Sequence, residues 1–102
     1  MKIQIREEVS EKDAARVAEL FSALSDTSRV RILIQLLHKE MNVGALAESV
    51  GISESAVSHH LRSLRLLHLV RARKEGRQVF YCLDDDHISE LINSGLDHVL
   101  HG

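Results

Sequence analysis

Two short segments with helical apolar periodicity, joined by a turn that contains glycine, constrain the fold of this chain more than any other feature. Apolar residues recur on one helical face over residues 43–50, and Gly51 suits the left-handed position at which helices often end. Ser53 can cap a longer helix over residues 54–67. Two helices joined by a turn of about three residues that includes glycine have the helix-turn-helix layout.

A basic β-hairpin is predicted directly after the second of these helices. Residues 70–74 and 78–83 have the composition of strands, and Glu75-Gly76-Arg77 supplies a turn in which glycine can adopt a positive φ. Three other segments have helical patterns, namely residues 10–24, 26–38 and 84–101. The fold class predicted from this order is mainly α with a small hairpin: a winged helix-turn-helix.

The apolar residues of the first two helices predict which faces are buried. On the first helix they are Ala14, Val17, Ala18, Phe21 and Leu24. On the second helix they are Val30, Leu33, Ile34 and Leu37. We expect each set to pack against a neighbouring element, because helices of small domains bury one apolar stripe.

Length and composition predict a single domain over residues 1–102, since the chain has no proline, linker or repeat. No stretch approaches the roughly 18 apolar residues of a membrane span, and the acidic N-terminus does not resemble a secretory signal. The one cysteine, Cys82, excludes an internal disulfide and fits a reducing compartment. We therefore expect a cytoplasmic protein with no membrane partner.

The formal net charge of −2 hides a strong segregation along the chain. Residues 53–80 contain six basic and two acidic side chains, whereas residues 81–102 contain five acidic side chains and no Lys or Arg. Residues 1–52 are nearly balanced. A basic segment is thus followed by an acidic tail, and the two segments predict different chemistry.

The helix over residues 54–67 combines a buried stripe with a polar face. Val57, Leu61 and Leu64 form the apolar stripe. The opposite side carries Ser55, Ser58, His59 and Arg62, with Arg65 to one side; the hairpin adds Arg71, Arg73, Lys74 and Arg77. Small polar side chains allow a helix close to base edges, and basic side chains neutralise phosphates. These nine residues are the predicted contacts to double-stranded DNA, although a solvated face and an ordinary charged hairpin are the alternative interpretation.

A domain of this size covers about one half-site of DNA. Specific binding by a helix-turn-helix usually requires a two-fold dimer whose half-sites lie about one DNA turn apart. We therefore expect a homodimer and an operator with two-fold symmetry.

Three histidines share one face of the last helix: His87, His98 and His101. His87 and His98 are about 16 Å apart along a helix, at 1.5 Å per residue, whereas a Zn–N bond is about 2.1 Å long. If a second copy packed antiparallel against this helix, His87 of one copy would lie beside His98 and His101 of the other copy. An aspartate can complete the site: Asp84 faces His87 if the helix has already begun there, whereas Asp85 requires an angled entry into the helix. A solvated polar face capped by acids is the alternative interpretation.

These residues resemble the ArsR/SmtB family of metal-sensing repressors. Ser53-Glu54-Ser55-Ala56-Val57-Ser58-His59-His60-Leu61-Arg62-Ser63-Leu64 is similar to the family's recognition helix, and Gly76-Arg77-Gln78-Val79-Phe80-Tyr81 to its wing. The tail pattern D-x-H-x10-H-x2-H matches the metal site of the zinc-sensing branch. The resemblance implies Asp85 and His87 of one chain with His98 and His101 of the other as ligands. It also implies a hydrogen bond from the ligand His98 toward the backbone carbonyl of His68.

Departures from the family pattern narrow the expected metal. Asn42 stands where relatives that sense arsenic, cadmium or lead often carry a cysteine, and one protomer cannot form a multi-thiolate site with Cys82 alone. Imidazoles with one carboxylate suit Zn²⁺, with Co²⁺ as a substitute. The implied function is an apo dimer that binds its operator and releases it when zinc binds. The alternative is a winged-helix regulator that responds to another metal or to a non-metal effector. An enzyme is not expected, because four protein ligands leave no open position for a catalytic water.

Overall fold

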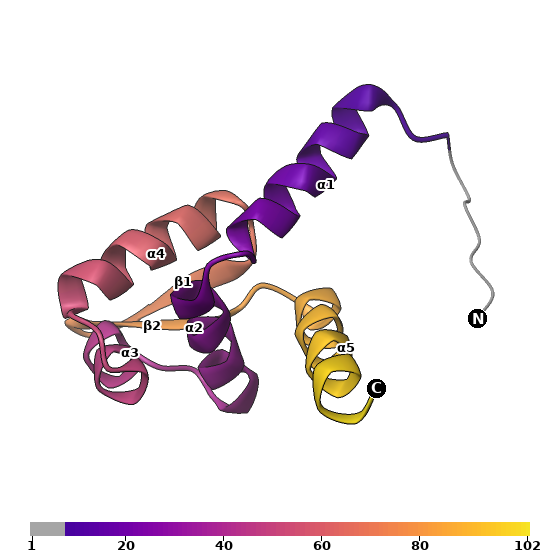
Figure 1. Ribbon diagram of the computed structural model, residues 1–102. Coiled ribbons are helices and arrows are strands. Elements are labelled where there is room, and N and C mark those ends of the chain that lie inside the picture. Colours follow the sequence, from indigo (N-terminus) through magenta and orange to yellow (C-terminus); the bar gives the residue numbers. More distant parts are fainter. Residues whose placement is uncertain (1–7) are drawn as a thin grey trace.

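The computed structural model describes residues 8–102 and consists of helices around a two-stranded hairpin (Figure 1). The elements are α1 (Glu11–Ala23), α2 (Thr27–His38), α3 (Val43–Val50), α4 (Glu54–Leu66), β1 (Val70–Glu75), β2 (Gln78–Leu83) and α5 (Asp86–His101). The predicted order of helices and strands is therefore confirmed. Residues 1–7 lie outside the described part of the chain. The structure therefore does not describe the segment that we compared with a secretory signal, or the first seven residues of the predicted domain.

A polar side chain caps the N-terminus of each helix. In every case the side-chain oxygen accepts a hydrogen bond from the backbone N–H three residues later, which satisfies one of the free donors of the first turn. The caps are Ser10, Asp26, Asn42, Ser53 and Asp85. At the other end of α3, Gly51 has a φ of +79°, so the turn needs the left-handed conformation expected there.

The core lies where α2, α3 and α4 meet the hairpin. The stripe predicted for α4 is confirmed, since Val57, Leu61 and Leu64 are all fully buried. The stripe predicted for α2 is partly wrong. Leu33 is buried as expected, but the other buried residues of this helix are Ile32 and Leu36, while Val30, Ile34 and Leu37 are half-buried. Because α2 contacts α3, α4, α5 and β2, it buries more than one side.

The hairpin pairs β1 with β2 in an antiparallel register that runs from Val70 opposite Leu83 to Glu75 opposite Gln78. The first strand is one residue longer than predicted, and Gly76 has a φ of +61° in the turn. A third segment joins the hairpin: the backbone N–H of Met41 donates to Tyr81 at 3.1 Å, and that of Tyr81 donates to Met41 at 2.8 Å. The loop between α2 and α3 is thereby fixed to the wing, as this hairpin is called below.

Helix α1 extends away from the core (Figure 1), and its buried residue, Ala23, lies at its C-terminal end. Most of the stripe predicted for it is not buried within the protomer, since Val17 is 48% exposed and Phe21 is 55% exposed, whereas Leu24 is half-buried against the core. On α5, Val99 is 80% exposed. A nearly apolar groove runs between the two helices. Phe21 of α1 and Val99 of α5 therefore border the same apolar groove.

Candidate nucleic-acid interface and metal-ligand residues

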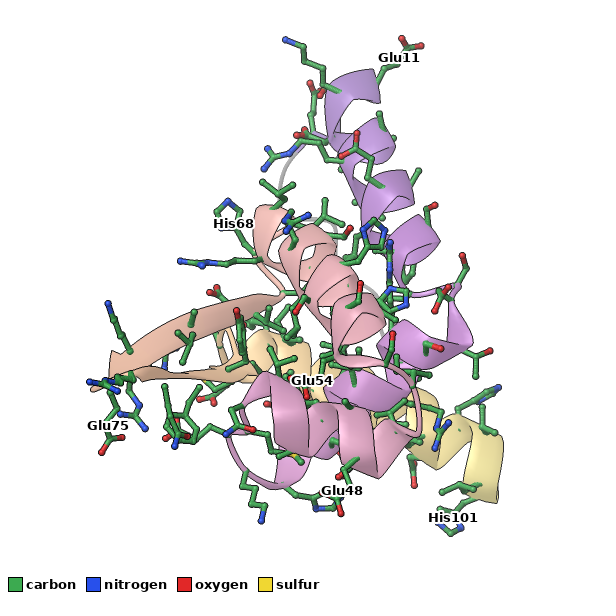
Figure 2. All side chains as sticks on the ribbon, turned by 90° about the vertical axis from the view of Figure 1, so that its left-hand side faces the viewer. Glu11, Glu48, Glu54, His68, Glu75 and His101 are labelled. Carbon is green, nitrogen blue, oxygen red and sulfur yellow. The ribbon has the colours of Figure 1, made fainter. Side chains whose placement is uncertain are left out.

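The outer face of α4 presents the predicted polar residues to solvent. Ser55, Ser58, His59 and Arg62 are exposed on the side opposite the buried stripe, and Arg65 is exposed near the end of the helix. Figure 2 labels Glu54 at the start of α4 and His68 just beyond its end, with the wing extending beside the helix to Glu75 at the tip. A hollow between helix and wing is lined by Ser58, Arg62, Arg65 and Tyr81, among others. This surface combines small hydroxyls with cations.

The four basic residues predicted on the wing are all exposed, but they are not equivalent. The Nε of Arg73 donates to Glu40 at 3.3 Å, and its Nη1 donates to Glu75 at 2.7 Å. These two carboxylates raise the pKa of Arg73, and Arg73 in turn lowers the pKa of Glu40 by hydrogen bonding. Within residues 8–102, Lys74 and Arg77 form no ion pair. The guanidinium of Arg73 is thus already neutralised within the protomer.

Arg71 has a different local partner. Its Nε donates a hydrogen bond to the Sγ of Cys82, which lies opposite it in the register, at 3.2 Å. This contact is the main cause of the raised pKa of Arg71. Cys82 is a half-buried free cysteine.

The entry into α5 determines which aspartate lies beside His87. Asp85 is the N-cap and has an extended backbone, with φ −156° and ψ 179°. Its Oδ1 accepts a hydrogen bond from the backbone of Ile88 at 3.2 Å, and its Oδ2 lies 3.6 Å from the Nδ1 of His87. Asp84 precedes the helix, and its backbone N–H donates to Leu69 at 3.0 Å. The helical premise for Asp84 is therefore wrong, and the backbone at Asp85 is extended rather than helical.

The other two histidines lie at the far end of α5. His98 and His101 are exposed in its last turn, and His101 is labelled in Figure 2 at the end of the helix. Among the residues that the structure describes, no three His, Cys, Asp or Glu side chains of one protomer lie close enough together to hold a metal ion. The two pairs of donors, Asp85 with His87 and His98 with His101, are thus separated within the chain.

His68 joins the end of α4 to the segment leading into the wing. It has a φ of +58°, and among residues 8–102 it is the one residue other than glycine with a positive φ. Its N–H donates to Arg65 at 3.0 Å, and the N–H of Leu69 donates to Leu64 at 2.9 Å. A hollow lined by His68, Leu69 and Ile88 connects this corner with the first turn of α5. The C-terminal end of α4 therefore lies near the Asp85–His87 end of α5.

Comparisons with known proteins agree with this fold. The model of the arsR family of bacterial regulatory proteins matches residues 26–72. The transcriptional repressor SmtB homolog of Synechocystis is 45% identical over 97 residues, covering 94% of this chain and 74% of that protein. The regulator NmtR of Mycobacterium tuberculosis is 43% identical over 88 residues, covering 86% and 73%. The cadmium resistance regulatory protein CadC homolog of Staphylococcus aureus is 37% identical, covering 91% and 78%.

Solved structures give the same result. The solution structure of apo-NmtR aligns with a TM-score of 0.79 at 38% identity, over 99% of this chain and 85% of that one. The homodimeric winged helix-turn-helix domain Mb0332 of Mycobacterium bovis aligns with a TM-score of 0.79 at 28% identity, over 96% of both chains. The predicted fold class, mainly α with a small hairpin in a winged helix-turn-helix, is therefore confirmed. Within residues 8–102, no helix combines the length and apolar character that crossing a bilayer requires.

Proposed function

Because the chain belongs to the ArsR/SmtB family of DNA-binding transcriptional regulators rather than to a family of enzymes, we propose that it is a zinc-responsive repressor. Its apo dimer binds an operator of two-fold symmetry, and zinc binding at the α5 helices releases the DNA. The observation that carries this proposal is the separation of the two donor pairs on α5 beside a basic winged helix. As a regulator that acts on bacterial DNA, it works in the cytoplasm.

DNA binding is assigned to the outer face of α4 and to the wing. Ser55, Ser58, His59 and Arg62 face the bases from the major groove, where small hydroxyls permit close approach and Arg or His can donate to guanine. The remaining contacts are to phosphates, from Arg65, Arg71, Lys74 and Arg77. Two copies of α4 in a dimer would reach half-sites about one DNA turn apart. Arg73 reaches a phosphate only if its ion pairs with Glu40 and Glu75 open.

Zinc is assigned to Asp85 and His87 of one protomer with His98 and His101 of its partner. The residues fit the metal, because one carboxylate and three imidazoles are donors that Zn²⁺ takes in a tetrahedral site and Co²⁺ accepts as well. The 3.6 Å between Asp85 and His87 supports the first half of this set. When bound, zinc supplies a link between the two α5 helices. An antiparallel pair of these helices would hold two such sites.

Release of DNA requires that zinc favour a dimer shape in which the two α4 helices no longer fit their half-sites. A preference of a few kcal/mol between the two shapes is sufficient. In an antiparallel dimer the partner's His98 would lie beside Asp85 and His87, near the corner at His68. A hydrogen bond from its second ring nitrogen toward the His68 carbonyl would link the ligand to the DNA-reading helix. Two cationic charges added to each protomer would strengthen DNA binding by attraction alone. The effect must therefore act through geometry.

The decisive experiment is a zinc titration of the protein bound to a DNA duplex that it selects from a random pool. The wild type should release the duplex as zinc is added, and His98→Ala should retain it because the site loses a ligand. His38→Ala is the matched control, since this exposed histidine at the end of α2 lies outside the site, and it should respond like the wild type. A wild-type protein that binds zinc and keeps its DNA affinity would show that the proposed function is wrong.

A second candidate is a regulator of the same fold that responds to another metal or to a non-metal effector. The relatives include proteins named for different roles, among them a cadmium resistance regulator. Asn42 argues against a thiolate site here, because it caps α3 and donates a hydrogen bond to Gln78 at 3.1 Å. Zinc stoichiometry separates the candidates: one Zn²⁺ per protomer supports the zinc sensor, and none supports the alternative.

A further inference from the structure

A side-chain hydrogen bond joins α2 to the DNA-facing helix. The Nε of Arg29 donates to the Nδ1 of His60 at 3.1 Å, between residues that are 31 positions apart in the chain. The contact is partly buried, and His60 itself is half-buried. Because Nδ1 accepts this bond, the neutral imidazole of His60 carries its proton on Nε2.

The backbone of Arg29 is held by a hydrogen bond at the start of α2. Its backbone N–H donates to the Oδ1 of Asp26, the N-cap of α2, at 3.0 Å. This hydrogen bond from the backbone of Arg29 is the largest cause of the lowered pKa of the Asp26 carboxyl. The residues Asp26, Arg29 and His60 therefore form a connected polar group at the junction of α2 and α4.

His60 is next to a residue assigned to the DNA interface. The ring centroids of His59 and His60 are 5.8 Å apart, with an angle of 60° between the ring planes. The other packing of α4 within the core is apolar, through Val57, Leu61 and Leu64. Apolar contacts are non-directional, whereas a hydrogen bond weakens steeply when its angle changes. The bond from Arg29 is thus the directional contact that restrains rotation of α4 about its axis.

We propose that Arg29 and His60 are positioning residues, which hold α4 and the ring of His59 at the angle required to read bases. The proposal rests on the DNA interface proposed above. Neither residue needs to touch the DNA. The consequence concerns sequence discrimination more than overall affinity, because phosphate contacts from the wing supply most non-specific binding while base contacts depend on the alignment of the helix.

The test compares two substitutions of His60 that differ in one acceptor. His60→Asn keeps an oxygen near the place of Nδ1, and His60→Leu removes the acceptor while keeping apolar bulk. Affinity is measured for the duplex that the wild type selects and for a scrambled duplex of the same length. We expect His60→Leu to lower the ratio of the two affinities about tenfold, which is the effect of losing one good base contact, with little change in scrambled-duplex binding. His60→Asn should restore most of the ratio.

A double-mutant cycle with Arg29→Met tests the pair itself. If the bond is the cause, Arg29→Met should lower the ratio as much as His60→Leu does, and the double variant should lower it no further. Additive losses, or equal ratios for His60→Leu and the wild type, would overturn the proposal. Thermal unfolding of each variant establishes that the protein is folded at the assay temperature.

Arg62→Ala, measured in parallel, separates this inference from the proposed interface. Loss of affinity in Arg62→Ala together with an unchanged ratio in His60→Leu overturns only the positioning role. If neither substitution changes binding, the assigned DNA-reading face is wrong, and the positioning role falls with it.

Discussion

At the scale of single residues, the backbone of His68 is the clearest case of a conformation held against its local preference. A left-handed conformation costs a non-glycine residue about 1–2 kcal/mol, and His is among the residues in which it is less rare. The two hydrogen bonds that end α4 at this corner, from the backbones of His68 and Leu69, hold it in place. The direction of the His68 carbonyl is set by this turn and not by the imidazole.

Two substitutions of His68, by glycine and by valine, should therefore change the free energy of unfolding in opposite directions. His68→Gly should raise the free energy of unfolding by about 0.5–1 kcal/mol, because the relief of strain exceeds the entropy that glycine adds to the unfolded chain. His68→Val should lower it by about 1 kcal/mol or more, because β-branched residues are genuine outliers at positive φ. Urea unfolding measures both, and equal stabilities of the two variants would contradict the argument. If coupling uses only the carbonyl, His68→Gly keeps the response to zinc.

The choice between Asp84 and Asp85 illustrates what the sequence alone could not decide. Both acids stand within reach of the start of α5, and the helical wheel favours Asp84 only if the helix includes it. The helix begins at Asp86, and the backbone of Asp84 is bonded to Leu69 from another part of the chain. A tertiary contact therefore sets the entry angle, and no local pattern encodes it. The resemblance to the family favoured Asp85, the residue that the structure brings beside His87.

At the scale of elements, the wing is fixed by contacts with the loop before α3. Met41 pairs with Tyr81, Asn42 bonds to Gln78, and Glu40 pairs with Arg73. Residues 40 and 73 are 33 positions apart, so their pairing was not visible in the sequence. The charge of Arg73 predicts a phosphate contact. In the structure its ion pair with Glu40 instead joins the wing to the loop before α3.

This difference predicts unequal effects of two substitutions that remove the same charge. Lys74→Gln should reduce the slope of log affinity against log salt concentration by about one, as expected when one phosphate contact is lost. Arg73→Gln should leave that slope nearly unchanged, because a guanidinium already neutralised by carboxylates displaces few counterions. Fluorescence anisotropy at several salt concentrations gives both slopes. Equal reductions would mean that Arg73 leaves Glu40 and binds DNA directly.

Elements differed in how far local patterns predicted them. The stripe of α4 was predicted correctly because this helix packs on the core with one side and exposes the other. The stripe of α2 was partly wrong because that helix is enclosed by four elements. The stripe of α1 has helical periodicity, but within the protomer only Leu24 of that stripe packs against the core, and Val17 and Phe21 are exposed. A single sequence shows that a face is apolar, and it does not show whether the covering surface belongs to the same chain.

At the scale of the whole molecule, one protomer is incomplete in two respects. Its radius of gyration is 14.9 Å, against about 13 Å for a compact chain of 100 residues, because α1 extends from the body (Figure 1). Its donor residues are divided between the two ends of α5. A dimer through α1 and α5 covers the apolar surface, and in an antiparallel arrangement it also brings the separated donor pairs together. The proposed second copy would therefore serve both the apolar surface and the proposed zinc site.

If the zinc site is divided between two protomers, a dimer of two different variants should bind zinc although neither variant binds it alone. A site within one chain would not give this result. In one variant Asp85 and His87 are both replaced by alanine, and in the other His98 and His101 are. Each homodimer should bind no zinc at the proposed sites, because both of its sites lack one donor pair. In the mixed dimer one site loses both pairs, and the other receives an intact pair from each chain. Co-expression with two affinity tags isolates this heterodimer, which should bind one Zn²⁺ per dimer, half the wild-type value. Metal analysis showing no zinc in the heterodimer would refute the shared site, and zinc retained by either parent homodimer would place the ligands elsewhere.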